Sequence, residues 1–324
     1  MRKILHITPH LGGGIGTVVL SWMEKDRNNN HILISLDHIN EKAQKILDEK
    51  HLRYNPRSGY TLDDEMFYAD IIIVHWWDHP MLADFFSRQR HPSRLVFWTH
   101  KNYPVPQEEL DYPDLFLDVS PVQGHGRHIW SCGNMERFLA IQPKKHKGFN
   151  VATVTSKKLH PDFVAISKRV NIPDIMFHVF GGAYRGLDAT EPPMFFAGQV
   201  DDIAPYIDQI TMDVFGYPLH ANHYGTAEQV LGEAMAAGVV PVVMDNPAEC
   251  LIVKDGVNGF VAKNQEEYVG LIEFLYKYPD IRQALAMNAR EDARKMYSID
   301  DMVRQWEEVF DELMKQPKKE RGTL

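Results

Sequence analysis

The sequence predicts an α/β protein built from two Rossmann-like halves, and three observations support this fold class. The chain has 324 residues, about the length of two domains that each bury a core. Short apolar runs alternate with longer amphipathic segments from end to end, as parallel strands alternate with crossover helices. Residues 142–150 are polar and basic, with a proline and a glycine, which indicates a linker between two such series.

The first half is expected to contain strands at residues 3–7, 31–36, 70–75, 94–98 and 115–119, with helices at 15–25, 41–50 and 81–88. The second half repeats the rhythm, with strands at 151–155, 176–180, 194–197, 213–217 and 240–244 and helices at 161–169, 226–237 and 265–276. Helical spacing then continues through 279–296 and 299–314 to the end of the chain.

Composition excludes several classes of protein. A net charge of -9 argues against the broad basic surface that binds nucleic acid. Cys132 and Cys250 lie far apart, which argues against a disulfide framework or a structural zinc site. The apolar run at the start is too short for a signal peptide, and no stretch approaches the roughly 20 apolar residues of a membrane span. We therefore expect a cytoplasmic protein whose membrane contact, where there is any, is peripheral.

A glycine-rich turn, Gly-Gly-Gly-Ile-Gly at residues 12–16, follows the first expected strand and opens the first expected helix. Glycines there allow backbone amides to approach an anion at the helix N-terminus. A dinucleotide fingerprint would need another glycine at Thr17, so the match is weak. Three interpretations stay open: contact with a phosphate or sugar, a tight structural turn, and a nicotinamide or flavin site.

A second loop and helix lie at residues 223–237, with Thr226 expected to be the N-cap. The amides at the start of such a helix suit a diphosphate. Glu233 falls in the first two turns, where a carboxylate can accept paired hydrogen bonds from a ribose diol. The alternative is an ordinary capped helix with a solvated glutamate.

Histidines follow two strands of the first half, at His75, His79 and His100. Ligands of parallel α/β sheets gather outside the carboxyl ends of strands, so His75 and His100 are candidate binding residues. Packing against the neighbouring tryptophans is an alternative role, and a metal pair of His75 and His79 is a further one.

The block at 217–243, with Glu-Ala-Met-Ala-Ala-Gly and Val-Pro-Val-Val, resembles the signature of glycosyltransferase family 4. The resemblance continues at 150–158, 177–182, 196–200 and 254–260, and is looser over the first half. It implies the GT-B fold, in which two Rossmann-like domains face each other across a cleft. An acceptor-binding domain at 1–148, a donor-binding domain at 149–297, and a helix and tail at 298–324 that pack back toward the first domain are then expected.

The resemblance also implies a function. Such enzymes transfer a sugar from a nucleotide-diphosphate sugar to an acceptor hydroxyl with retained configuration, commonly in surface glycan assembly. We expect a metal-independent hexosyltransferase with no cofactor, whose partners are the donor and a glycan or lipid-linked acceptor. Glu233 matches the family glutamate that holds the ribose, and His100 resembles the family histidine that meets the donor sugar.

Two positions depart from the family pattern. The family glutamate that contacts the donor sugar is replaced by Gly225, so His223 or Glu228 is expected to take its role. His223 is favoured because Glu228 and Glu233 would point about 140° apart on one helix, whereas His223 precedes the helix and would approach the sugar more freely. The family's arginine and lysine are replaced by Lys157 and Lys158, which are expected to hold the diphosphate. Exposed loop lysines are the alternative.

Glycine turns and the loop before the helix are expected to supply the remaining donor contacts. The expected donor-binding residues are Gly13, Gly14, Gly181, Val200, Tyr224, Gly225, Thr226, Ala227, Glu228 and Glu233. The expected catalytic residues are His100, Lys157, Lys158 and His223. The pair Asp201 and Asp202 is expected to cap a helix rather than bind a metal.

Two other functions remain alternatives. The first is a GT-B scaffold that binds a nucleotide sugar or a partner without transferring the sugar, which the replacement at Gly225 favours. The second is a nicotinamide-dependent oxidoreductase that uses the glycine turn at 12–16.

Overall fold

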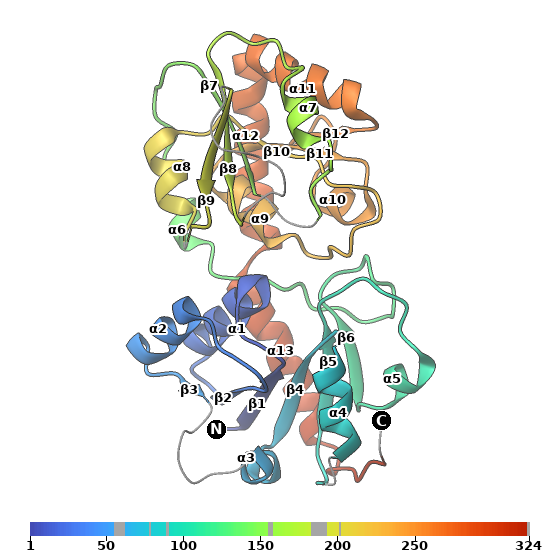
Figure 1. Ribbon diagram of the computed structural model, residues 1–324. Coiled ribbons are helices and arrows are strands. Elements are labelled where there is room, and N and C mark those ends of the chain that lie inside the picture. Colours follow the sequence, from blue (N-terminus) through green and yellow to red (C-terminus); the bar gives the residue numbers. More distant parts are fainter. Residues whose placement is uncertain are drawn as a thin grey trace. The chain divides into compact units, whose positions relative to one another are not determined.

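A computed structural model describes residues 1–54, 62–77, 79–88, 91–154, 158–182, 193–200 and 202–322. The chain forms two compact units (Figure 1). The first unit contains residues 1–134 and 298–324, and the second contains residues 135–297. The polar segment at 142–150 that the sequence indicated as a linker thus lies inside the second unit.

The first unit contains a parallel sheet of six strands in the order β3-β2-β1-β4-β5-β6. Its strands are β1 (Lys3–Thr8), β2 (Asn30–Ser35), β3 (Arg53–Tyr54), β4 (Ile71–Trp76), β5 (Leu95–Thr99) and β6 (Leu115–Asp118). This is the doubly wound order, in which ligands bind outside the carboxyl ends of the strands near the point where the order reverses. That point lies between β1 and β4.

Helices cover both faces of this sheet (Figure 1). They are α1 (Gly13–Lys25), α2 (Glu41–Glu49), α3 (Leu62–Tyr68), α4 (Pro80–Arg88), α5 (Gln107–Asp111) and α13 (Ile299–Met314). Apolar side chains of α3 and α4 pack on one face, and those of α1 and α2 on the other. The last helix, α13, packs against α1, and the Trp22 and Trp306 rings lie 4.6 Å apart.

The second unit repeats the strand order of the first, because its parallel sheet runs β12-β11-β10-β7-β8-β9, with β7 in the place of β1. The strands are β7 (Phe149–Val154), β8 (Ile175–Phe180), β9 (Met194–Gly198), β10 (Val214–Tyr217), β11 (Val240–Met244) and β12 (Phe260–Ala262). The reversal of order here lies between β7 and β10.

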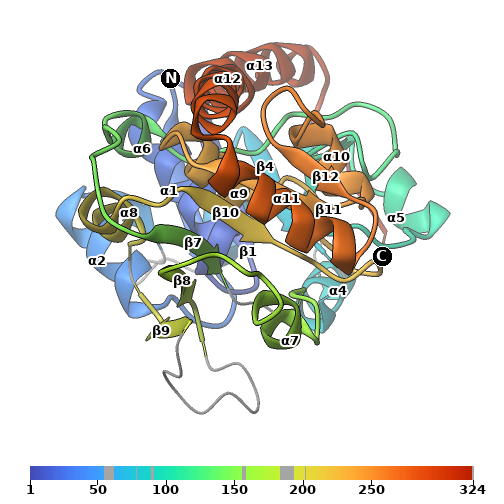
Figure 2. The same ribbon diagram turned by 90° about the horizontal axis from the view of Figure 1, so that it is seen from above.

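The helices of the second unit are α6 (Glu136–Leu139), α7 (Phe163–Ser167), α8 (Ala204–Ile210), α9 (Gln229–Ala236), α10 (Pro247–Ile252), α11 (Gln265–Lys277) and α12 (Pro279–Met296). Three of them, α9, α11 and α12, contact β11 (Figure 2). The long helix α12 also packs along α9. Tyr297, which directly follows α12, contacts the turn at the start of α9.

The two Rossmann-like sheets confirm the predicted fold class. Each strand expected from the sequence is present within two residues at either end. Two short edge strands, β3 and β12, were not predicted, because two or three residues are too few for a visible alternation. Helix α9 begins at Gln229 rather than Thr226, which changes the geometry of the loop before it.

Candidate functional site

In the second unit, a short antiparallel contact brings Lys158 to the carboxyl end of β10. Leu159 pairs with Leu219 as an antiparallel bridge. The amide of His220 donates to the carbonyl of Lys158 at 2.9 Å, and the amide of His160 donates to Pro218 at 2.8 Å. The segment that follows β7 is thus fixed to the segment that follows β10, beside the reversal point of the sheet.

Lys158 forms an ion pair with Glu228 at this edge. The Lys158 ammonium lies 2.6 Å from Oε1 and 2.7 Å from Oε2 of Glu228. The Tyr217 hydroxyl donates to Oε2 at 3.1 Å. The Glu228 side chain is 1% exposed and that of Lys158 is 16% exposed, so the pair is largely withdrawn from water. Lys157, its predicted partner in binding, lies outside the described residues.

Glu228 occupies the N-cap position of α9 in a left-handed conformation, with φ 32° and ψ 64°. The Tyr297 hydroxyl donates to the carbonyl of Ala227 at 2.8 Å and holds this turn. Gly232 permits the approach, because a Cβ there would lie 2.5 Å from the Tyr297 ring. The prediction of Thr226 as the N-cap is therefore wrong. The estimate of 140° between Glu228 and Glu233 also fails, because Glu228 precedes the helix.

The position that departs from the family pattern, Gly225, has no room for a side chain. A Cβ placed on Gly225 would overlap Oε1 of Glu228 and lie 2.7 Å from Nδ1 of His223. The carboxylate of Glu228 thus fills the space in which a side chain of residue 225 would begin.

His223 is fixed in the same loop by two hydrogen bonds. The Gly225 amide donates to Nδ1 at 2.9 Å, so the ring proton is on Nε2, which donates to Glu249 at 3.1 Å. The side chains of His223 and Glu249 are 3% and 0% exposed. The expectation that His223 approaches a ligand freely is therefore wrong: the ring is a buried anchor of the loop.

Other predicted donor-binding residues surround this loop. Thr226 and Ala227 are buried, whereas Tyr224 is 45% exposed and its ring centroid lies 6.0 Å from the Lys158 ammonium. Glu233 is partly buried in the second turn of α9. The side chains of Tyr224 and Glu233 are thus partly accessible, whereas Thr226 and Ala227 are buried.

A turn at the ends of β8 and β9 holds the two remaining positions. Gly181 has φ 114°, a conformation that favours glycine, and its amide donates to the carbonyl of Gly198 at 2.8 Å. Val200 is partly buried just beyond. Asp202 accepts from the Ala204 amide at 3.1 Å and pairs with Arg137 at 3.0 Å, but the N-cap of α8 is Ile203, which makes no side-chain cap hydrogen bond, so Asp202 does not occupy the cap position. Asp201 lies outside the described residues.

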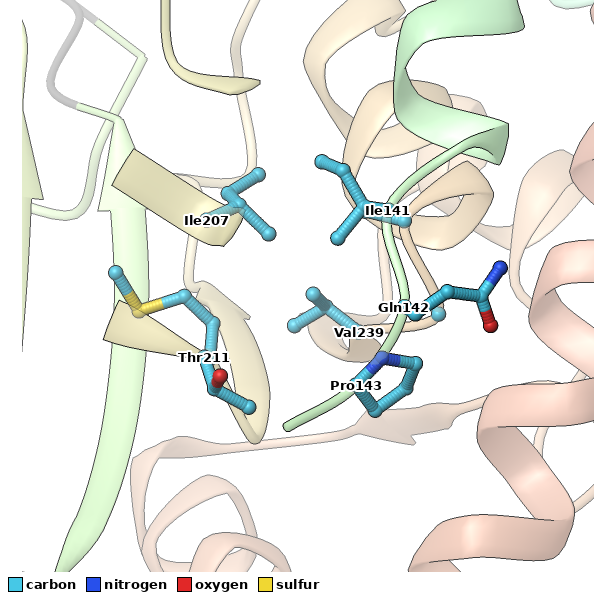
Figure 3. Close-up of a pocket in the computed structure, with 9 residues that line it drawn as sticks. Ile141, Gln142, Pro143, Ile207, Thr211 and Val239 are labelled. Carbon is cyan, nitrogen blue, oxygen red and sulfur yellow. The ribbon is translucent and has the colours of Figure 1, made fainter. Parts of the chain in front are cut away.

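A small pocket elsewhere in the second unit is not this site (Figure 3). It is lined by Ile141, Gln142, Pro143, Ile207, Thr211, Met212, Ala237, Gly238 and Val239. Its volume of about 10 Å³ admits no more than one water molecule. Because Val239 directly precedes β11, the pocket lies at the amino end of that strand, away from Lys158.

In the first unit, the glycine turn opens α1. A Cβ on Gly12 would lie 2.6 Å from Nδ2 of Asn40, the N-cap residue of α2, so a larger residue would displace that side chain. Gly13 has φ 56°, which also favours glycine. A Cβ on Gly14 would meet nothing within 4 Å, and both Gly13 and Gly14 are exposed. Packing within the protein therefore does not explain glycine at position 14, and the amides stay accessible to a ligand.

A chain of hydrogen-bonded imidazoles crosses the first sheet and ends at His100. His100 Nε2 lies 3.0 Å from His75 Nδ1, and His75 Nε2 lies 3.2 Å from His6 Nδ1. His6 Nε2 lies 2.8 Å from His31 Nδ1, and His31 Nε2 lies 2.8 Å from Asp26 Oδ2. His75 thus contacts histidines of neighbouring strands as well as the Trp98 ring.

Burial keeps three rings of this chain, those of His6, His75 and His100, uncharged. Desolvation lowers the pKa of His75 to about 3. Desolvation and neighbouring imidazoles hold the pKa values of His6 and His100 well below the ordinary value. For Asp26, burial opposes ionisation, but hydrogen bonds from His31 and Asn29 outweigh it and lower the pKa to about 2. His6, His75 and His100 are therefore neutral, and Asp26 is ionised, in the folded protein at neutral pH.

His79 does not join this chain. Its ring lies 6.1 Å from that of His10 and 5.9 Å from that of Trp77. Within the described ranges, no cluster of three or more histidine, cysteine or acidic side chains is arranged to hold a metal ion. In the same part of the chain, no helix combines the length and apolar character needed to cross a bilayer.

Sequence reasoning missed several of these residues. Asp26, His31 and His6 were not selected, although a histidine within an apolar strand, as in Lys-Ile-Leu-His-Ile-Thr at 3–8, is a visible signal. Tyr217 and Glu249 were also missed. Nothing in their local sequence indicates that they bind Glu228 and His223, because these contacts join separate elements.

Comparison with known proteins agrees with this fold. Residues 137–292 match the family "glycosyl transferases group 1". No curated protein sequence gives a significant match.

Three solved structures illustrate the likeness of the whole chain. A glycosyltransferase from Rickettsia africae ESF-5 is similar with a TM-score of 0.75 and 14% identity, over 97% of this chain and 99% of that one. Anabaena Alr3699/HepE in complex with UDP-glucose is similar with a TM-score of 0.74 and 16% identity, over 96% and 100%. Sucrose-phosphate synthase from Thermosynechococcus elongatus is similar with a TM-score of 0.71 and 13% identity, over 97% and 100%.

The chain therefore has the α/β fold of GT-B glycosyltransferase structures, with two Rossmann-like units, and its second unit matches the glycosyl transferases group 1 over residues 137–292.

Proposed function

We propose that this protein is a glycosyltransferase that uses a nucleotide-diphosphate sugar and binds it through the second unit. The observation that carries the proposal is the match of residues 137–292 to the glycosyl transferases group 1. Within that span, Lys158, Glu228 and the start of α9 gather at the carboxyl edge of the sheet, where doubly wound folds bind ligands. The similar Anabaena structure is described in complex with UDP-glucose.

Within this proposal, the side chains have separate roles. Lys158 binds the diphosphate together with Lys157, and Glu233 accepts hydrogen bonds from the ribose hydroxyls. Backbone groups of Gly181, Tyr224 and the turn before α9 contact the donor. Gly13 and Gly14 in the first unit offer amides to a phosphate or to the acceptor.

Glu228, rather than His223, is proposed to contact the donor sugar. Its carboxylate occupies the space next to Gly225 where the family places a glutamate side chain. The carboxylate accepts from Lys158 and Tyr217 but has acceptor capacity left for a hydroxyl, whereas the two ring nitrogens of His223 are both used by protein partners. Glu228→Gln should lower turnover by about tenfold or more, in line with the loss of a charge-assisted hydrogen bond. His223→Ala should instead lower thermal stability. If His223→Ala alone abolishes turnover in the folded protein, the original assignment of His223 is correct.

The main experiment uses a panel of sugars linked to UDP, GDP or ADP. Each donor is first screened for thermal stabilisation of the protein. Donors that stabilise it are then assayed for sugar transfer to glycan and lipid-linked acceptors. Transfer with retained configuration supports the proposal. Tight binding without transfer or donor hydrolysis would identify a binding scaffold instead. Stabilisation by a nicotinamide cofactor, and by no nucleotide sugar, would support an oxidoreductase.

The proposed transfer uses lysine side chains, not a divalent metal, to stabilise the leaving diphosphate, and requires no cofactor. Turnover in EDTA should equal turnover in magnesium within error. Activity that disappears in EDTA and returns with magnesium or manganese would refute this role of the lysines. We also propose that the protein is located in the cytoplasm, which cell fractionation would test, with sedimentation with anionic vesicles to detect peripheral membrane contact. We propose further that its acceptors belong to surface glycan assembly.

A further inference from the structure

A histidine and an aspartate form a pair at the end of β6, the edge strand of the first sheet, and the transfer proposed for the second unit does not use it. Asp118 is the last residue of β6, and its side chain is 1% exposed. Oδ1 of Asp118 lies 2.8 Å from Nδ1 of His125, and Oδ2 accepts from the backbone amide of His125 at 2.8 Å. Among the residues that the structure describes, His125 is the sole hydrogen-bond partner of this carboxylate.

The loop after β6 is shaped to turn His125 back onto the strand. Gly124 and Gly126, on either side of His125, have φ 75° and φ 128°, conformations that favour glycine. A Cβ on either glycine would meet nothing within 4 Å, so the backbone turn and not a lack of space requires them. Nε2 of the buried Gln123 donates to the carbonyl of Thr99 at 2.9 Å, which ties the loop to the end of β5.

Two contacts hold the ring of His125 and leave one of its nitrogens for a ligand. Asp118 contacts Nδ1, and the Phe116 ring packs at 5.4 Å between centroids with an interplanar angle of 76°. The His125 side chain is 15% exposed. In the described part of the chain, Nε2 has no hydrogen-bond partner and is not enclosed. The ring can therefore interact with a ligand only through Nε2.

Closure of the loop does not explain the buried carboxylate. The Asp118 amide donates to the carbonyl of Arg127 at 3.1 Å, and the Ile129 amide donates to the carbonyl of Asp118 at 3.0 Å. These backbone hydrogen bonds already return the loop to β6. A buried carboxylate costs free energy unless it is hydrogen-bonded, and here its partner is the one histidine whose ring it orients.

We propose that His125 is a ligand-contacting residue of the first unit, which forms a hydrogen bond through Nε2 to a hydroxyl group, and that Asp118 positions its ring. The pair lies at the carboxyl edge of the sheet, where ligands of parallel α/β sheets gather. The assignment of this hydroxyl to the sugar acceptor rests on the proposed function. The orientation of the ring does not.

The chemistry of the pair favours a hydroxyl over an anion. An aspartate carboxylate is ionised at neutral pH and only accepts hydrogen bonds, so Nδ1 of His125 keeps its proton and Nε2 is the nitrogen that gains or loses one. A hydroxyl both donates and accepts, and can therefore bond to Nε2 in either charge state of the ring. An anion would lie close to the negative charge of Asp118 and would be attracted only by the protonated ring.

Nitrogen-15 NMR of the full-length protein labelled at histidine tests the orientation of the ring. The signals of His125 are assigned by their loss in His125→Asn and are followed with rising pH until the ring is neutral. The expected tautomer is Nδ1–H. In Asp118→Asn the side-chain oxygen must still accept from the backbone amide, so the new amide group faces Nδ1 and should convert the ring to Nε2–H. An Nε2–H ring in the unmodified protein, or an unchanged tautomer in Asp118→Asn, would overturn the role of Asp118.

Titration in the same spectra tests the chemistry of the ligand. The probes are the methyl glycosides of glucose, galactose and mannose, with inorganic phosphate for comparison. At least one glycoside should shift the Nε2 signal of His125 and leave the signals of His128, an exposed histidine of the same segment, in place. A shift with phosphate alone would identify an anion site, and a shift with none of the probes would exclude a hydroxyl contact. Either result would overturn the proposal.

Kinetics separate the contact from folding. The amide of His125→Asn can donate to Asp118 from near the place of Nδ1, but the variant has no group in the place of Nε2. Its urea midpoint should match that of the unmodified protein, and kcat/KM for the acceptor should fall about fivefold, or about 1 kcal/mol, with the KM of the donor unchanged. The matched control, His128→Asn, should change none of these values.

An unchanged kcat/KM in His125→Asn, or equal losses in His125→Asn and His128→Asn, would overturn the contact. Because the spectra need no transfer, absence of transfer by the unmodified protein would count against the proposed function only.

Discussion

The two sheets share one strand order, yet they carry different kinds of buried polar group. The first sheet carries a line of hydrogen-bonded imidazoles that ends in a carboxylate, and the second carries an ion pair between Lys158 and Glu228. A neutral hydrogen-bonded ring costs little to bury, while a buried charge needs an opposite charge close by. The strand order thus determines where a site lies in such a fold. The side chains at the site determine whether it titrates and whether it can bind an anion.

The tryptophans provide a way to observe the two units separately. All six, at positions 22, 76, 77, 98, 130 and 306, belong to the first unit. Tryptophan fluorescence therefore follows unfolding of the first unit, and far-ultraviolet circular dichroism follows both units.

The largest expected difference is the response to acid. The folded first unit keeps His6, His75 and His100 neutral, with the pKa of His75 lowered to about 3 from 6.5, while the unfolded chain protonates near 6.5. Between those pKa values the unfolded state binds more protons than the folded state. The free energy of unfolding therefore decreases by about 1.4 kcal/mol for each unit by which the pH is lowered, for each such histidine. Asp26, whose pKa is lowered to about 2 from 3.8, adds a loss only below about pH 4.

Urea unfolding is measured at pH 7.5, 6.5 and 5.5. As the pH is lowered, the midpoint of the fluorescence transition should move to lower urea concentration by more than the midpoint of the second unit does. In the second unit, His178 also has a pKa lowered by burial, which contributes a smaller shift of the same sign. A fluorescence midpoint that does not change between pH 7.5 and 5.5 would show that the imidazoles are not buried in neutral form.

The second largest effect is expected for Lys158→Met, which leaves the buried Glu228 carboxylate without its cation. The second unit should lose about 3 kcal/mol of unfolding free energy, the cost of breaking a buried pair from one side. Circular dichroism should show this loss while the tryptophan transition stays in place. The matched control is Lys158→Met combined with Glu228→Gln, which should recover most of it. A loss below about 1 kcal/mol for the single variant would mean that the pair is solvated.

A smaller effect, on binding rather than folding, is expected for Glu233→Ala. Removal of its charge-assisted hydrogen bonds to the ribose should weaken nucleotide binding by about 1.5 to 3 kcal/mol. Helix α9 should persist because alanine favours helices more than glutamate does. Calorimetric titration with UDP, GDP and ADP measures the change, with the exposed Glu266→Ala of α11 as the control. Equal affinities for the two variants would remove Glu233 from the site.

The smallest effect is expected for Gly225→Ala, which should destabilise the second unit by about 1 to 3 kcal/mol because its Cβ overlaps Glu228. In a Glu228→Ala background the same substitution should cost less, since the overlapping carboxylate is gone. A double-mutant cycle of unfolding free energies measures this coupling. Additive changes would show that Glu228 does not fill the space beside Gly225.

The sequence predicted much of the fold because the relevant signals are local. Strands such as β4 and β11 are short apolar runs, and helices such as α12 and α13 show helical spacing over several turns. The start of α9 was missed because Glu228 adopts a left-handed conformation that the Tyr297 hydroxyl helps to hold from the end of α12. No local pattern around Thr226 reveals a contact with a residue 70 positions away.

The sequence by itself determined the fold class and the repeated strand and helix rhythm, and it predicted His100, Lys158 and the loop before α9 as ligand-binding positions. Only the tertiary structure decided which side chains meet. Lys158 and Glu228 are 70 residues apart, and His6 and His75 are 69 apart. Alternation along a strand shows which residues share a face, but the strand order β2-β1-β4-β5 makes the four histidines neighbours. That order arises from crossover connections and packing of the whole sheet, so the chain from Asp26 to His100 exists only in the folded protein.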